Sequence, residues 1–158
     1  MREMGENETT RALDIALKSD RADWFGAVPD EMIAAAEKHL GVHFPPSYRE
    51  FVRRVGYLGI GPREFYGITE EGLTDTSIPS VIFATQSTRE TGGLPQGLLL
   101  IEYSGGEEIY VIDTRSTAAD QEAPVSVWMP EFHNSLELPR IAPDFGSYLL
   151  SIVEADRG

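Results

Sequence analysis

Residues 29–56 read PDEMIAAAEKHLGVHFPPSYREFVRRVG, and this stretch predicts two consecutive helices. Pro29 and the two acidic residues after it favour a helix start, because proline suits the first turn and acidic groups interact favourably with the helix dipole. Gly41 predicts the end of this helix, since glycine readily adopts the left-handed conformation found at helix C-termini. The residues expected on its inner side are Ile33, Ala36, Glu37 and Leu40.

The second helix of this stretch starts at Pro45-Pro46-Ser47 and ends at Gly56. Its apolar residues recur with the i, i+3, i+4, i+7 spacing that is typical of an amphipathic helix. These residues are Tyr48, Phe51, Val52 and Val55. Together the two helices predict a helical hairpin.

From Gly59 onward the pattern predicts strands, the first of them over residues 63–68. Residues 98–103 and 108–113 predict a β-hairpin, because two apolar runs flank a turn that contains Gly105-Gly106. A two-residue turn there predicts the pairs Leu99–Ile112, Leu100–Val111 and Ile101–Tyr110. Since both faces of these strands carry apolar residues, we expect them to be central strands that are covered on both sides.

Residues 80–91 are compatible with a strand or a helix. We favour the helix, since Ser80 is a good N-cap and Gly92-Gly93 a good stop. Residues 125–129 alternate and predict another strand. Pro143-Asp144 opens a last amphipathic helix, and we count as its apolar residues Ile141, Phe145, Tyr148, Leu149 and Ile152. This order predicts an α+β fold in which the helical hairpin packs on a mainly antiparallel sheet that the C-terminal helix closes.

The 158 residues suit a single domain, 1–158. We expect a short amphipathic helix over residues 8–18, with Trp24-Phe25 anchored on the main core. The chain contains no cysteine, which excludes disulfides and thiolate metal sites and fits a reducing compartment. The polar N-terminus does not resemble a secretory signal, and no apolar run approaches the ~20 residues of a membrane helix. We therefore expect a cytoplasmic protein that does not bind membranes.

Charge is the most unusual feature of the composition. The chain carries 26 acidic residues against 13 Lys and Arg, a net charge of −13. The excess falls mainly after residue 60. Such a surface repels phosphate backbones, so we expect no nucleic-acid binding. The charge has two possible interpretations: solubility alone, or a negative face that meets a basic protein partner.

Several fragments, in order, resemble the SUKH superfamily. Residues 29–52 are similar to its signature, in which a glutamate-bearing helix, a leucine-glycine step and a hydrophobic-proline step precede a tyrosine-led helix. Residues 65–68 resemble its first strand, residues 93–95 the entry to its central hairpin and residues 108–113 the second strand of that hairpin. The resemblance closes with Ile141-Ala142 and the helix after it. It covers about residues 24–153, which leaves residues 1–23 as an N-terminal extension.

The resemblance implies an α+β fold and a non-catalytic binding protein. Bacterial members are immunity proteins (antitoxins) that neutralise polymorphic toxins, often nucleases or deaminases, whereas fungal relatives regulate cell-wall synthesis. The leading hypothesis is therefore an immunity protein whose acidic surface occupies the basic groove of a cognate toxin. The alternative is an intracellular regulatory or scaffolding module without a toxin partner.

Catalytic and metal-binding patterns are weak in this sequence. His39 and His43 have the spacing of a helical metal pair, but Gly41 breaks the helix between them; the third histidine is His133. No G-x-S-x-G elbow occurs, and no glycine pair lies between a strand and a helix as a phosphate loop requires. We expect no enzyme activity, no metal, no cofactor and no small-molecule substrate.

For partner binding we predict two sets of residues. The acidic set comprises Glu64, Glu70, Glu71, Asp75, Glu102, Glu107, Glu108 and Asp113, and its alternative is a solvated rim. The aromatic set comprises Tyr57, Tyr66, Tyr103 and Trp128. Because Val125, Val127 and Met129 share one face of their strand, Trp128 lies either under the C-terminal helix or on the surface as an interface anchor.

Overall fold

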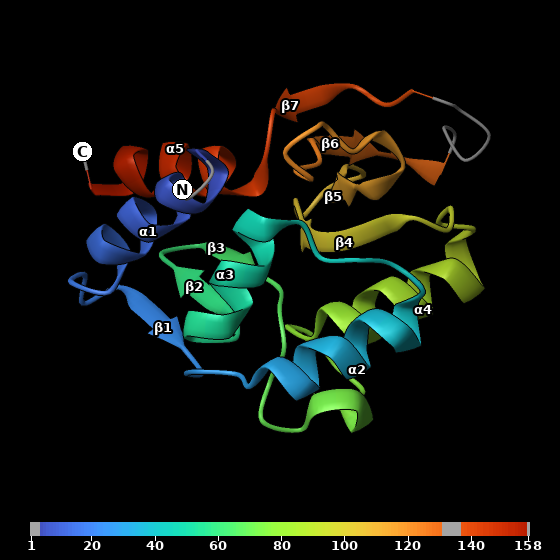
Figure 1. Ribbon diagram of the computed structural model, residues 1–158, viewed down its shortest axis with the longest axis horizontal. Coiled ribbons are helices and arrows are strands. Elements are labelled where there is room, and N and C mark those ends of the chain that lie inside the picture. The colour runs from blue at the N-terminus through green and yellow to red at the C-terminus, as the bar shows by residue number, and fades with distance from the viewer. Residues whose placement is uncertain (1–3, 131–136, 158) are drawn as a thin grey trace.

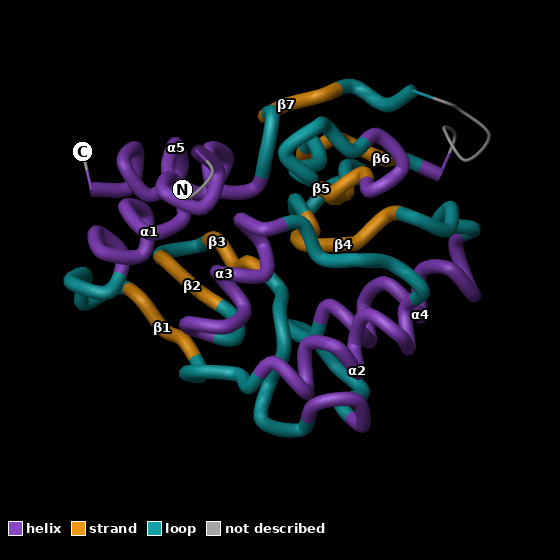
Figure 2. Tube along the Cα trace, in the orientation of Figure 1, coloured by secondary structure: helices purple, strands orange, loops and turns teal. Residues whose placement is uncertain are grey.

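The computed structural model describes residues 4–130 and 137–157. These residues form five α-helices, two short 3₁₀ helices and two antiparallel sheets, so the predicted α+β class is confirmed (Figures 1 and 2). The helices are α1 (Met4–Ala16), α2 (Asp30–Leu40), α3 (Pro46–Val55), α4 (Val81–Gly92) and α5 (Phe145–Arg157), with η1 (Gly72–Thr74) and η2 (Thr114–Ser116).

The strands divide into two sheets. The smaller sheet has the order β1 (Ala22–Trp24), β2 (Leu58–Ile60), β3 (Arg63–Phe65), and the larger has the order β4 (Leu98–Tyr103), β5 (Ile109–Asp113), β6 (Val125–Trp128), β7 (Arg140–Ala142). Sequence reasoning anticipated β4 to β6. The strand predicted over residues 63–68 is shorter than expected, since β3 ends at Phe65. β1, β2 and β7 were not anticipated, because strands of three residues are too short to show an alternating pattern.

The helices α2 and α3 follow the sequence closely. The side of α2 that the structure buries consists of the four residues predicted for it, and Gly41 ends the helix in the left-handed conformation with φ 71°. The predicted apolar stripe of α3 is buried as well. The two helices have different main neighbours, however: α3 lies beside α1, whereas α2 lies beside α4 (Figure 1).

The predicted helix over residues 80–91 is confirmed as α4. The Ser80 hydroxyl accepts a hydrogen bond from the Phe83 N–H at 3.1 Å, which is the N-cap contact expected from the sequence. Gly93 ends the helix with φ 74°. The amide of Leu100 donates to the Thr85 hydroxyl at 3.0 Å, so α4 is fixed against the outer edge of β4.

The β4–β5 hairpin has the predicted pairs Leu99–Ile112 and Leu100–Val111. The predicted pair Ile101–Tyr110 is wrong, because the register shifts between Leu100 and Glu102 and Tyr110 faces Glu102. At this irregularity the Ile101 carbonyl accepts the amide of Tyr66 at 2.9 Å. The shift therefore joins the segment after β3 to the larger sheet.

Two further expectations are corrected. Trp24 and Phe25 do not anchor on the core: they lie in and just after the edge strand β1 and remain 38% and 39% exposed. Ile141 belongs to β7 and is 44% exposed, since the helix begins only at Phe145. Asp144 accepts the Ser147 N–H at 2.7 Å and fixes that helix start.

The core lies between the helices and the buried faces of both sheets. Leu98, Leu99, Leu100 and Ile101 are all fully buried, which confirms that β4 is covered on both faces. The expectation that β4 is a central strand is wrong, because β4 is the end strand of the larger sheet. Helix α1, part of the predicted N-terminal extension, buries Ala12 and Leu13 and packs along α5 and α3. Among the described residues, no helix combines the length and apolar character needed to cross a membrane.

Candidate functional site

Four of the twelve predicted partner-binding residues are buried and cannot contact a partner in this conformation. Glu102 is one of them, at 3% exposure. Its carboxylate accepts two hydrogen bonds from the Arg63 guanidinium, at 2.6 and 2.9 Å, and one from the Tyr148 hydroxyl at 2.7 Å. A buried carboxylate needs such partners to offset its desolvation. Glu102 therefore connects β3, β4 and α5 and is not a docking charge.

Asp113 is the second predicted partner-binding carboxylate that is buried, also at 3% exposure. It accepts two hydrogen bonds from the Arg115 side chain, at 2.9 and 3.1 Å, and one from the Arg115 N–H. These contacts hold the start of η2. The partly buried Asp75 is occupied in a similar way, since it accepts hydrogen bonds from the hydroxyls of Thr69 and Ser77 in its own loop.

Two residues of the predicted aromatic set are also buried. Trp128 is fully buried, on the side of α4 near Gly92 rather than under α5. Tyr66 is 3% exposed, and burial raises its pKa to about 12. Tyr103 is 40% exposed, but its ring packs on Tyr66 and its hydroxyl shares a hydrogen bond with Thr88 at 3.0 Å.

The exposed members of the predicted acidic set lie in two places. Glu107 and Glu108 lie at the tip of the β4–β5 hairpin. Glu64, Glu70 and Glu71 lie on β3 and in the loop that precedes η1. Sequence reasoning placed all of them on the surface correctly, since strand ends and turns carry solvated charge.

The structure groups Glu64 and Glu70 with two other residues, Tyr57 and Asp23. Burial raises the pKa of the half-buried Tyr57 phenol, and the charges of Asp23, Glu70 and Glu64 raise it further. Burial and the charge of Asp23 likewise raise the pKa of Glu64. Asp23 was missed because it lies on β1, a strand too short to recognise. Its position directly before two exposed aromatic residues was the available signal.

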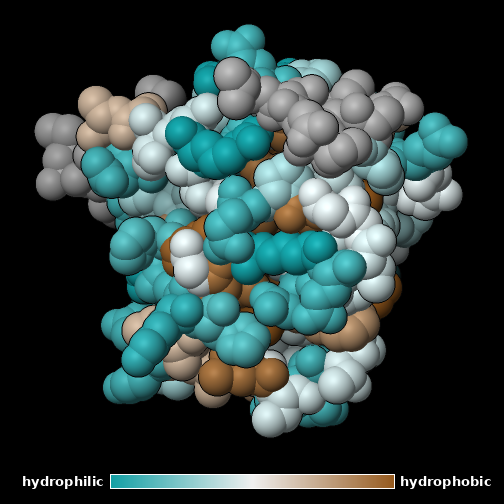
Figure 3. Space-filling view, turned by 90° about the vertical axis from the view of Figure 1, so that its right-hand side faces the viewer, coloured by the Kyte–Doolittle hydropathy of each residue, from teal (hydrophilic) through white to brown (hydrophobic). Residues whose placement is uncertain are grey.

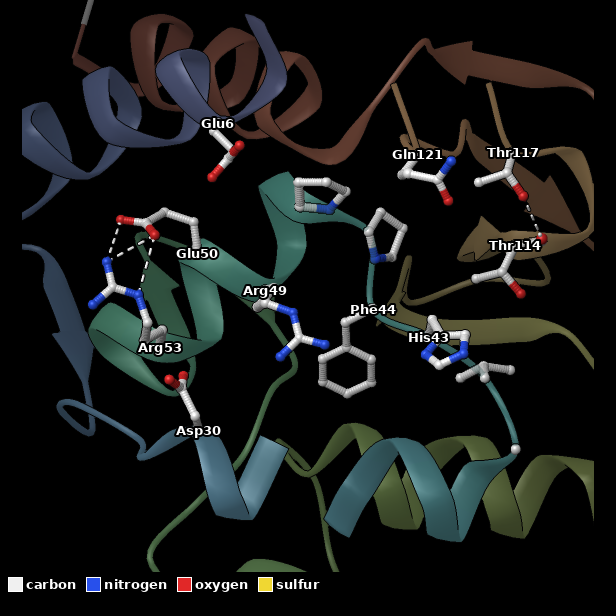
Figure 4. Close-up of a pocket in the computed structure, with 14 residues that line it drawn as sticks. Glu6, Asp30, His43, Phe44, Arg49, Glu50, Arg53, Thr114, Thr117 and Gln121 are labelled. Atoms are coloured by element: carbon white, nitrogen blue, oxygen red, sulfur yellow. Dashed lines mark hydrogen bonds and ion pairs between the residues drawn. The ribbon is translucent and has the colours of Figure 1, made fainter. Parts of the chain in front are cut away.

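A groove of about 650 Å³ runs along α3 from Pro46 to Arg53 (Figure 4). Its floor is the α2–α3 linker, and its charged residues come from α1, α2 and α3. Arg53 forms a bidentate pair with Glu50, and this contact raises its pKa, with smaller contributions from Asp30 and Glu6. The arginines of this groove are therefore compensated by neighbouring carboxylates and do not form a free cationic site.

Glu37, on the buried side of α2, fixes the linker beside this groove. Its carboxylate accepts the Phe44 N–H at 2.7 Å and an Arg49 N–H at 2.5 Å. One side chain thus holds both the extended step after Gly41 and the first turns of α3. The glutamate in the helical signature has a structural role in this chain.

Glu122 is a buried carboxylate in the loop before β6. It accepts hydrogen bonds from the Ser47 N–H at 2.9 Å and the Ser47 hydroxyl at 2.8 Å, and so caps α3 from a distant part of the chain. Gly5 of α1 and Asp144 before α5 lie against it. Burial raises the pKa of Glu122 to about 7, although its bonds to Ser47 oppose the shift.

The structure describes two of the three histidines. His43 is exposed, and its Nδ1 lies 3.8 Å from Glu37; His39 is also exposed, and His133 falls outside the described residues. Within residues 4–130 and 137–157, no group of three His, Asp or Glu side chains could hold a metal ion.

Comparison with known proteins gives one result. The family model SUKH_5, described as SMI1-KNR4 cell-wall, matches residues 13–154. The match covers most of the chain and begins within the predicted N-terminal extension. A search among curated proteins found no significant match.

Proposed function

Because the chain belongs to the SMI1-KNR4 (SUKH) family, we propose that it is an immunity protein that binds and neutralises a cognate bacterial toxin, most simply one with a basic nuclease-type domain. The observation that supports this proposal is the exposed acidic surface. After the buried carboxylates are set aside, Glu64, Glu70, Glu71, Glu107 and Glu108 remain accessible. The net charge of −13 adds a long-range attraction for a cationic protein.

The proposed mechanism is occlusion and not catalysis. Carboxylates on the protein surface would occupy the cationic groove in which the toxin holds its polyanionic substrate. Complementary charge accelerates association and selects against other partners. Since the toxin must be blocked where it is made or delivered, we place this action in the cytoplasm.

The test is protection of cells. A candidate toxin domain, taken from the reading frame beside this gene, is expressed with and without the protein. We expect growth to be restored by co-expression and the purified complex to weaken as salt rises. Salt-insensitive binding with full protection would contradict the acidic mechanism but leave immunity in place.

The description of the matching family as SMI1-KNR4 cell-wall favours a second candidate. In this alternative the protein is a regulatory or scaffolding module of the cell-wall-synthesis type that binds an intracellular protein. It predicts no protection against the neighbouring gene product. A change in cell-wall composition after deletion of the gene would support it.

A further inference from the structure

The smaller sheet has one face that no described element covers. Leu58, Ile60 and Phe65 point to its buried side, where Phe65 packs against the ring of Tyr148 in α5. On the opposite side the register aligns Asp23, Gly59 and Glu64 in one row across the three strands. We call these three residues, together with Tyr57 and Glu70 beside them, the open face.

Gly59 is the unusual member of the open face. It lies inside a strand, where glycine is disfavoured because it loses more backbone entropy and packs no side chain. Its backbone is not among those with positive φ, so the conformation does not require glycine. Space does not require it either: a Cβ at this position would meet its nearest neighbours, atoms of Arg63 and Asp23, at ordinary distances of 3.9–4.0 Å.

Neither the backbone conformation nor the packing around Gly59 therefore explains why this position lacks a side chain. The missing side chain leaves a gap between two carboxylates that flank it in register. A glycine within a strand often marks a place where a ligand or another backbone approaches closely. The carboxylates of Asp23 and Glu64 define the charge that such a group should carry.

We propose that the open face is the docking surface for an extended, arginine- or lysine-bearing segment of the protein partner, with one cationic side chain seated over Gly59. Charge complementarity selects this occupant, because Asp23, Glu64 and Glu70 already influence one another or the Tyr57 phenol electrostatically. Trp24 does not belong to the open face, because it pairs with Leu58 and its side chain leaves β1 on the opposite side from Asp23. This inference rests on the proposed function in one respect, the identification of the partner as a toxin. The docking surface itself does not depend on it.

The decisive variant is Gly59→Thr, because it changes no charge. Threonine suits an exposed strand position and fits the available space, so we expect an unchanged or higher unfolding temperature. The probe is a blocked peptide of alternating arginine and threonine, titrated into the isotope-labelled full-length protein and followed by NMR. We expect the largest shifts at the open face and affinity about tenfold weaker in Gly59→Thr.

Two comparisons make the result specific. The same peptide with citrulline in place of arginine should bind far more weakly, which identifies the charge as the recognised feature. The double variant Glu90→Gln/Glu154→Gln removes equal charge from exposed positions on α4 and α5, and we expect its affinity to stay within about twofold. The double variant Asp23→Asn/Glu64→Gln should lose binding even if Gly59→Thr folds poorly.

The proposal is overturned if Gly59→Thr is folded and binds the peptide as the original protein does. It is also overturned if shifts centre on the hairpin tip, if calcium alone produces them, or if the protein self-associates through this face. The toxin assay separates the two levels of inference. Failed protection with peptide binding at the open face refutes immunity alone. Protection by both Asp23→Asn/Glu64→Gln and Gly59→Thr refutes the docking surface alone.

Discussion

The two sheets of this protein use their faces differently. In the larger sheet, β4 carries four consecutive fully buried residues, with α4 fixed along its outer edge. In the smaller sheet only one side is buried, and Asp23, Gly59 and Glu64 face solvent on the other. The difference indicates that the larger sheet mainly stabilises the fold. Residues on the outer side of the smaller sheet can change without loss of core packing.

The largest expected effect is in the larger sheet. Leu100→Ala should lower the free energy of unfolding by about 2–5 kcal/mol, because the fully buried side chain leaves a cavity. The matched change in the smaller sheet is Glu64→Gln, expected within about 0.5 kcal/mol. Urea denaturation followed by circular dichroism measures both, and equal losses would remove the distinction between the sheets.

The next effect tests the contact that joins the sheets. Glu102→Gln leaves the Arg63 guanidinium without its counter-charge, and since Arg63 is partly exposed we expect a loss of about 2 kcal/mol. Replacing both partners, as Arg63→Met/Glu102→Leu, should recover part of that loss, because no unpaired charge remains. A double variant less stable than Glu102→Gln would contradict this interpretation of the pair.

A pH effect is expected at Glu122, behind the larger sheet. Its pKa is about 7 in the folded protein against an ordinary 4.5, so the folded state holds this proton more tightly than the unfolded state. The stabilisation is complete below pH 4.5 and is lost as the pH rises through 7. Relative to Glu122→Gln, the original protein should lose about 3 kcal/mol between these limits, since each pKa unit corresponds to about 1.4 kcal/mol. Parallel stability curves for the two proteins would show that Glu122 is ionised throughout.

A smaller effect, of opposite sign, is expected on α4. The Nε and Nη2 atoms of Arg89 are buried and have no hydrogen-bond partner in the part of the chain that the structure describes. Burial also lowers the pKa of this guanidinium. Arg89→Met should therefore raise the free energy of unfolding by about 1 kcal/mol. Arg53→Met, which removes an arginine paired with Glu50, should give no such gain in the same thermal unfolding experiment.

The smallest effect sharpens the description of the open face. Asp23→Asn should lower the pKa of Glu64, because it removes the neighbouring negative charge while the effect of burial remains. Stability should change by less than about 0.5 kcal/mol. An NMR titration of the Glu64 carboxyl carbon measures the shift, and an unchanged midpoint would place the two carboxylates out of electrostatic contact.

The sequence predicted those parts of the fold that have strong periodic patterns. The buried sides of α2 and α3, the Ser80 cap and two of three hairpin pairs follow from residue spacing and local capping chemistry. The short strands β1, β2 and β7 did not follow, since three residues cannot display a period. Their pairing is determined by long-range contacts such as Asp23 with Gly59.

The candidate site was less predictable for a related reason. Glu102 and Asp113 have the composition of surface charge, and only tertiary structure shows that Arg63 and Arg115 neutralise them in buried positions. Burial of Trp128 was one of the two alternatives predicted from the sequence. Which side of the sheet its side chain occupies could be known only from the position of α4. Gly59 could not be recognised from the sequence, because its proposed role depends on the exposed face of the sheet around it.

The single backbone bond from Tyr66 to Ile101 has a consequence for dynamics. It ties the segment that leaves the smaller sheet to β4 of the larger one, so we expect the two sheets to open together at this point. Amide hydrogen exchange at Tyr66 should then proceed only through global unfolding, at the same free energy as the amides of β4. A partner that occupied the outer side of β2 would thus slow exchange in a strand that it never touches.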